Sequence, residues 1–204
     1  MTPKRIDRQA RREEILDAAV RVFARKGFTA SRIDDVANEA GIGKGSVYLY
    51  FDSRDALLNA AFEAFAARSQ HVLDQARRGG DPPLERISAL VHAVLRALSE
   101  EPDLARILLD LWSAGREGDL PLDMAGLYAQ YRTVLTELLA QAGAEGSARP
   151  GLGERHATVI VGAIEGCLLQ WLLDPRLPVE EMADPILDVC LNGLRCRDES
   201  QAGR

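Results

Sequence analysis

The sequence of 204 residues predicts an all-α fold, with a small helical domain at the N-terminus and a larger helical body after it. Two observations carry this prediction. Apolar side chains recur at the spacing of an amphipathic helix along most of the chain. No stretch alternates apolar and polar residues for longer than about four residues, as a half-buried strand would. The composition, 47% hydrophobic and 27% charged, is typical of a folded globular protein.

About nine helices are expected, separated by segments rich in Gly and Pro. In the first helix, Ile15, Ala19 and Val22 form one apolar face, and Gly27 marks its end. Pro185 falls inside the last helix, where its missing backbone donor predicts either a kink or a helix start at residues 184–185. The expected helices span residues 7–26, 32–40, 44–50, 53–78, 84–99, 103–114, 121–142, 153–173 and 179–196.

Charge is unevenly distributed along the chain. The net charge is −6, but residues 1–55 carry 11 basic and 9 acidic side chains, whereas residues 56–204 carry 14 and 22. A mildly basic N-terminal segment allows a polyanion as the partner of that segment only. A basic N-terminus is also common on proteins that bind no polyanion.

The sequence shows no sign of secretion or membrane insertion. No segment resembles a signal peptide, and the longest nearly apolar run, residues 157–173, is short for a bilayer span and contains Glu165. Its 3 cysteines are too few for a disulfide scaffold and lack zinc-ligand spacing. We expect a cytoplasmic protein with reduced, structural cysteines, no metal, no cofactor and no membrane partner.

The segment 27–58 has the spacing of a helix-turn-helix. Ser31 can cap the second helix, with Asp34 three residues later as its capping-box partner. Gly41 follows that helix directly, where a left-handed conformation is expected. Val47 and Phe51 then point back to the core from a third short helix. Two short helices joined by a Gly-containing turn form the motif.

The outward side of this motif suits nucleic acid. Lys44 favours phosphate oxygens, and Gly45 and Ser46 allow close approach to a groove. The Tyr hydroxyls can donate to phosphates, and Arg54 follows at the start of the next helix, near the same backbone. An ordinary helical hairpin with a Gly turn is the alternative interpretation of the spacing alone.

The segment resembles the DNA-binding part of the TetR (tetracycline-repressor-like) family of transcriptional regulators. The family's tyrosine-any-tyrosine-phenylalanine string stands here as residues 48–51. This chain departs from the family in having Gly43 for Ser or Thr, Leu49 for a frequent His, and Arg54 for Lys. The resemblance also rests on Gly27, Phe28, Ser31, Ile33, Val36, Ala37, Ala40, Gly41, Lys44, Gly45, Ser46, Val47, Ser53, Leu57 and Leu58.

The resemblance implies a ligand-responsive regulator, and more specifically a repressor that binds a pseudo-palindromic operator in double-stranded DNA as a homodimer and is released by a small-molecule effector. It implies a DNA-binding domain over residues 1–55 and a ligand-binding and dimerisation domain over residues 56–204. The residues expected to bind DNA are Ser31, Arg32, Ile42, Gly43, Lys44, Gly45, Ser46, Tyr48, Leu49, Tyr50 and Arg54.

The helical body contains aromatic residues that can line a ligand cavity with a few polar groups among them. Each is also a candidate for ordinary core. Because aromatic residues outnumber charged ones in this set, the expected effector is largely apolar. The candidate ligand-binding residues are Phe65, Arg68, Leu108, Trp112, Tyr128, Tyr131, Arg132, Glu165 and Trp171.

The last two long helices are expected to form the dimer. Gly162 and Gly166 are small residues four apart that let another helix approach closely, and two such helices from each subunit make a four-helix bundle about a two-fold axis. The alternative is that both helices are ordinary core. The expected interface residues are Val159, Gly162, Ala163, Gly166, Cys167, Ile186, Val189 and Cys190.

Two other classes of function compete with a DNA-binding regulator. An enzyme is not expected, because the sequence contains no G-x-S-x-G, P-loop, H-E-x-x-H or dinucleotide-binding glycine motif. A helix-turn-helix protein that serves only as a protein-interaction module, without an effector, is the remaining alternative. A gel shift on DNA upstream of its own gene separates these possibilities.

Overall fold

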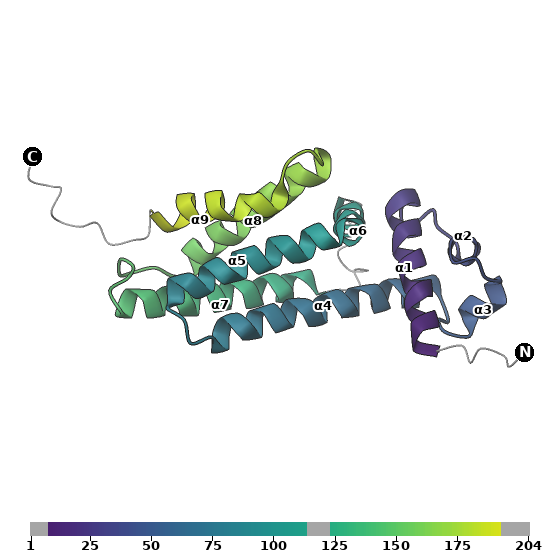
Figure 1. The fold of residues 1–204 in the computed structure, drawn as a ribbon, viewed down its shortest axis with the longest axis horizontal. Helices are drawn as coiled ribbons and strands as arrows, with labels where there is room; N and C mark the ends of the chain where they lie inside the picture. Colours follow the sequence, from purple (N-terminus) through teal and green to yellow (C-terminus); the bar gives the residue numbers. More distant parts are fainter. Residues whose placement is uncertain (1–7, 114–122, 193–204) are drawn as a thin grey trace, which may run out of the picture. The chain divides into compact units, whose positions relative to one another are not determined.

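The computed structural model describes residues 8–113 and 123–192, with side chains for residues 8–110 and 123–191. Within these residues every regular element is helical, which confirms the all-α prediction (Figure 1). The helices are α1 (Arg8–Lys26), α2 (Ile33–Glu39), α3 (Lys44–Tyr48), α4 (Arg54–Arg78), α5 (Pro83–Glu100), α6 (Pro102–Ser113), α7 (Met124–Ala144), α8 (Glu154–Leu173) and α9 (Ala183–Asn192).

The expected helices agree with the observed ones to within a few residues, except at the last. There the chain forms a short 3-10 turn, Val179–Met182, and α9 begins only at Ala183. Of the two alternatives for Pro185, the helix start is therefore the correct one. Proline is tolerated in the first turn of a helix because its missing N–H has no partner there anyway.

The chain forms two compact units, each of which is interrupted in sequence. The first comprises Met1–Ala67 and Glu101–Asp123, and the second comprises Arg68–Glu100 and Met124–Arg204. In the first unit α6, which follows the second unit's α5 in sequence, lies against α1. The predicted boundary after residue 55, between a DNA-binding domain and a ligand-binding and dimerisation domain, concerns function rather than compactness and stays a prediction.

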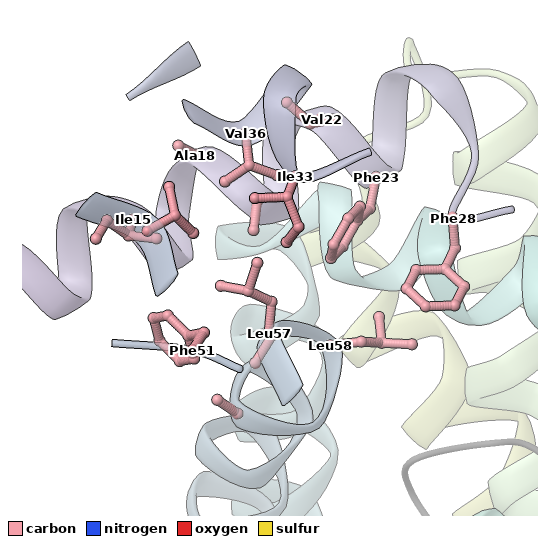
Figure 2. Packing of buried hydrophobic residues seen from close by; sticks show 14 of the residues in the cluster. Ile15, Ala18, Val22, Phe23, Phe28, Ile33, Val36, Phe51, Leu57 and Leu58 are labelled. Carbon is pink, nitrogen blue, oxygen red and sulfur yellow. The ribbon is translucent and has the colours of Figure 1, made fainter. Parts of the chain in front are cut away.

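The core of the first unit is built from α1, α2, α3, the beginning of α4 and α6, and Figure 2 shows part of it. Ile15 and Val22 are fully buried, as the predicted apolar face of the first helix requires. The rings of Phe23 and Phe28 meet edge to face, with centroids 5.2 Å apart. Burial of each such side chain contributes about 1.5–3 kcal/mol, so this small helical unit is held by its apolar interior.

The core of the second unit is built mainly from α5, α7, α8 and α9, which lie alongside one another (Figure 1). On α5, Ile87, Val91 and Leu95 are buried, in agreement with the predicted apolar stripe. On α7, Leu135 and Leu139 are buried against them.

Among the described helices, α8 is long and apolar enough to cross a membrane by length and composition alone. A helix in the core or interface of a soluble protein meets the same criterion, so this is weak support for a membrane span.

Candidate nucleic-acid interface

The turn between α2 and α3 has the geometry that the sequence predicts. Gly41 has a φ of +66°, in the left-handed region that favours glycine. The N–H of Ile42 donates to the carbonyl of Ala37 at 3.0 Å, and the half-buried Ile42 side chain packs against the core. Val47 and Phe51 are buried on the inner side. The helix-turn-helix is therefore anchored from within, and its opposite side is free to meet a partner.

The predicted cap of α2 is wrong by one residue. Ser31 is buried, and its Oγ donates backward to the carbonyl of Gly27 at 2.7 Å. The capping residue is Arg32, whose backbone N–H donates to the Asp35 carboxylate at 2.9 Å. Ser31 therefore closes the α1–α2 loop from inside, and Arg32 is the exposed residue of the pair.

Most of the other residues predicted to bind DNA lie together on the outer surface. Tyr48 and Leu49 are 46% and 70% exposed, which is unusual for side chains of this size. A Cβ atom added at Gly43 or Gly45 would meet no other atom within 4 Å, so the backbone there is open to close approach. Tyr50 is half-buried and packs against the core. Gly43, Lys44, Gly45, Ser46, Tyr48 and Leu49 are the exposed members, and we call them the α3 surface.

Lys44 on the α3 surface is paired with an acidic side chain that the sequence analysis did not connect with it. Its Nζ lies 2.8 Å from Oδ2 of Asp34, in the first turn of α2. This hydrogen bond raises the pKa of Lys44, so the ammonium stays charged. The sequence gives no sign of this ion pair, because its two residues are ten positions apart and only the fold brings them together.

Two more carboxylates of α2 tie it to α1. Glu39 accepts from Arg25 at 2.8 Å and from Arg21 at 3.1 Å, and Asp35 accepts from Lys26 at 2.5 Å. These bonds lower the pKa of both carboxylates. Solvent screens exposed pairs of this kind, so they add little to stability, and their main effect is to fix the angle between the two helices.

Arg54 lies at the start of α4, as predicted, and its side chain bonds to the loop between α1 and α2. Its Nη1 lies 2.9 Å, 3.1 Å and 2.7 Å from three backbone carbonyls of the α1–α2 loop, those of Phe28, Thr29 and Ser31. Its guanidinium also stacks over the Phe28 ring, 4.3 Å from the centroid. The expected contact between Arg54 and a DNA phosphate would require this guanidinium to leave the loop that it holds.

The predicted ligand-binding residues are divided between the two units. Phe65 and Leu108 pack against the core of the first unit. Tyr131 and Trp171 pack against the core of the second. Arg68 is exposed, and the side chain of Trp112 lies outside the described residues.

Within the second unit, the predicted polar residues form pairs. The Tyr128 hydroxyl bonds to Glu165, and burial, followed by this bond, raises the pKa of Tyr128. Tyr131 bonds to the buried Ser69, and burial raises its pKa as well. Arg132 lies 3.6 Å from Glu154. Both half-buried tyrosines therefore stay neutral; the Tyr131 hydroxyl meets a buried serine, and the Tyr128 hydroxyl meets an exposed carboxylate.

The predicted dimer residues differ in exposure and fall into three sets. Val159 and Val189 are 65% and 78% exposed, and a Cβ at Gly162 or Gly166 would meet nothing within 4 Å. Ala163, Cys167 and Cys190 are half-buried. Ile186 is buried at 5% exposure, so this residue belongs to the intrachain core and was wrongly placed at the outer surface. We call Val159, Gly162, Gly166 and Val189 the α8–α9 face.

In the part of the chain that the structure describes, no group of three or more His, Cys, Asp or Glu side chains is placed to hold a metal ion. Cys167 and Cys190 are free thiols. Cys196 lies outside the described residues.

Comparison with known proteins identifies both parts of the chain. Residues 15–61 match the family described as bacterial regulatory proteins of the tetR family, and residues 83–191 match the C-terminal region of BetI-type transcriptional repressors. The transcriptional repressor KstR2 of Mycolicibacterium smegmatis is 31% identical over 149 residues, which cover 70% of each chain.

Two solved structures show the same fold. The fatty acid degradation regulator FadR of Bacillus halodurans superposes with a TM-score of 0.73 at 25% identity, over 91% of this chain and 97% of its own. FadR of Bacillus subtilis, solved in complex with stearoyl-CoA, has a TM-score of 0.71 at 22% identity, over 90% and 99% of the two chains. With the helix-turn-helix geometry, the family matches show that the chain belongs to the TetR family and is a DNA-binding transcriptional repressor.

Proposed function

We propose that the protein binds a pseudo-palindromic operator as a homodimer, with the α3 surface of each subunit in the major groove. The observation that supports this most directly is the outward side of α3. There, small residues, the Lys44 ammonium and two large exposed side chains lie opposite the buried Val47. Gly43, Lys44, Gly45, Ser46, Tyr48 and Leu49 are the proposed contact residues, with Arg32 beside them.

Two of the residues first expected at DNA have another role in this proposal. Ser31 and Arg54 hold the α1–α2 loop, and they act on DNA binding by positioning α2 and α3. Ile42 and Tyr50 contribute mainly by packing against the core of the first unit. Residues 1–55 make up the proposed DNA-binding domain.

The α8–α9 face is the proposed dimer interface. It presents large apolar side chains and open glycines that no element among residues 8–113 and 123–192 covers, which is unusual for a monomer. A second copy related by a two-fold axis would cover it, and a stable interface of this kind buries at least about 1,200 Å² in total. The two recognition helices would then be about 34–36 Å apart, one turn of DNA.

The proposed effector is a small, largely apolar molecule bound by residues 56–204. The aromatic side chains of α7 and α8 supply apolar surface, and the neutral hydroxyls of Tyr128 and Tyr131 supply hydrogen-bonding groups. FadR of Bacillus subtilis was solved with stearoyl-CoA, whose stearoyl chain is apolar and whose coenzyme A part is anionic, so only the acyl chain supports an apolar ligand in a protein of this fold. The relatives are DNA-binding regulators, so the proposed location is the bacterial cytoplasm.

A gel shift with the DNA upstream of the protein's own gene tests the proposal. We expect a shifted complex whose affinity falls with salt, because Lys and Arg contacts to phosphates release counter-ions. Lys44→Ala should weaken this complex while the protein stays folded. An unshifted probe across the upstream region at low salt would instead favour a protein-interaction module. An unchanged affinity of Lys44→Ala would contradict the assignment of α3.

A further inference from the structure

Asp34 is the acidic residue of α2 whose charge faces the α3 surface. The other two carboxylates of this short stretch, Asp35 and Glu39, bond to basic residues of α1. Asp34 instead bonds to Lys44, the first residue of α3, at 2.8 Å. The pair is accessible to solvent, since the side chains of Lys44 and Asp34 are 50% and 55% exposed.

A carboxylate and a phosphate oxygen compete for the same ammonium. A lysine is a point charge with three donors, and a nearby anion both occupies a donor and cancels the charge that DNA would meet. An uncancelled lysine at a phosphate displaces about 0.9 counter-ion from the duplex. A lysine with a carboxylate 2.8 Å away displaces less, because the pair has no net charge.

We propose that Asp34 is an internal competitor for the DNA phosphate at Lys44, and that it lowers the sequence-independent affinity of the protein for DNA. The inference rests on the proposed contact of Lys44 with DNA. The backbone attraction supplies essentially all of non-specific binding, so Asp34 sets how strongly the protein is held at sites that are not its operator.

The test is a double-mutant cycle on the full-length protein. The variants are Asp34→Asn, Lys44→Ala and the double variant, and the probe is a fluorescent duplex of unrelated sequence titrated over a series of salt concentrations. Asp17→Asn is the control, because it makes the same change in net charge at an exposed position of α1. Anisotropy gives the affinity, and its dependence on salt gives the slope.

We expect Asp34→Asn to tighten binding about two- to fivefold at low salt, the range that corresponds to an exposed ion pair. It should also steepen the salt dependence by up to about 0.9. Both gains should vanish in the double variant, which should match Lys44→Ala, and Asp17→Asn should give less than half of the gain.

Three results would overturn the proposal. They are an unchanged affinity of Asp34→Asn, an equal gain for Asp17→Asn, and a gain that persists without Lys44. If Lys44→Ala has no effect in either background, then the proposed phosphate contact itself is wrong. If the wild type binds no duplex, the proposed function fails as well.

Discussion

Replacing Arg54 with Met should destabilise the first unit without altering the number of DNA phosphates that the protein contacts. Met keeps a long apolar stem but removes the guanidinium that bridges the carbonyls of Phe28, Thr29 and Ser31. Nη1 carries two hydrogens, so these contacts amount to two full hydrogen bonds from a charged donor, worth about 1.5 kcal/mol each or more. The stacking on Phe28 adds about 0.5–1 kcal/mol. The expected loss is therefore about 3.5–4 kcal/mol or more in the free energy of unfolding.

Urea denaturation followed by circular dichroism measures this loss. Arg96→Met is a matched control, because Arg96 is exposed on α5 in the second unit and the same substitution there should cost less than about 0.5 kcal/mol. Operator binding by Arg54→Met should weaken, since the loop that sets the start of α2 is no longer held. The salt dependence of the remaining binding should be that of the wild type.

The opposite pattern would refute this account of Arg54. If the stability of Arg54→Met is unchanged and its salt dependence is flatter by about 0.9, then Arg54 is a phosphate ligand, as the TetR resemblance suggested. Arg54→Lys separates the two roles further. Lys keeps the charge for a phosphate, but its side chain is shorter and lacks the planar guanidinium that stacks on Phe28, so it should restore only part of the lost stability.

Three further perturbations test the rest of the structure. Gly41→Ala should cost about 1–2 kcal/mol in unfolding free energy because of its φ of +66°, whereas Gly45→Ala, in open space at the α3 surface, should leave the fold intact and weaken DNA binding in a gel shift. Gly166→Leu should shift the protein from dimer to monomer in sedimentation while its helix content stays constant, and an unaffected dimer would contradict the α8–α9 interface. The pKa of Glu39 is lowered in the folded state, so its contribution to stability is present above its usual pKa of 4.5 and is lost as the pH falls below that value; Glu39→Gln should lose less stability than the wild type between neutral and acidic pH.

The fold was largely predictable from local pattern. Apolar residues at helical spacing predicted eight helices to within a few residues, and Gly41 predicted its own backbone conformation, because both depend on neighbours in sequence. The start of α9 was predicted only as one of two alternatives, since a proline is compatible with a kink and with a first turn.

The site was less predictable, because its polar groups are placed by tertiary contacts. Ser31 has the chemistry of an N-cap, yet the loop that precedes it offers the Gly27 carbonyl as a closer partner. Arg54 stands where the family has a lysine, but its longer, forked side chain reaches into that same loop. The exposed residues of α3 were predicted correctly as a group, since the buried Val47 and Phe51 fix which side of the helix faces outward.

These contacts place two kinds of charge around the helix-turn-helix. One kind holds α1, α2 and the loop between them through hydrogen bonds and ion pairs, and it includes Arg54, Lys26 and the arginines paired with Glu39. These basic groups therefore add little to the attraction for DNA. Lys44 is the basic side chain within the α3 surface, and Asp34 offsets it. A reading surface with so little free charge depends on shape and on the contacts of Tyr48 and Leu49 for its affinity. Charge-based attraction would therefore come mainly from outside α3, and operator affinity should be more sensitive to Leu49 than the affinity for unrelated DNA is.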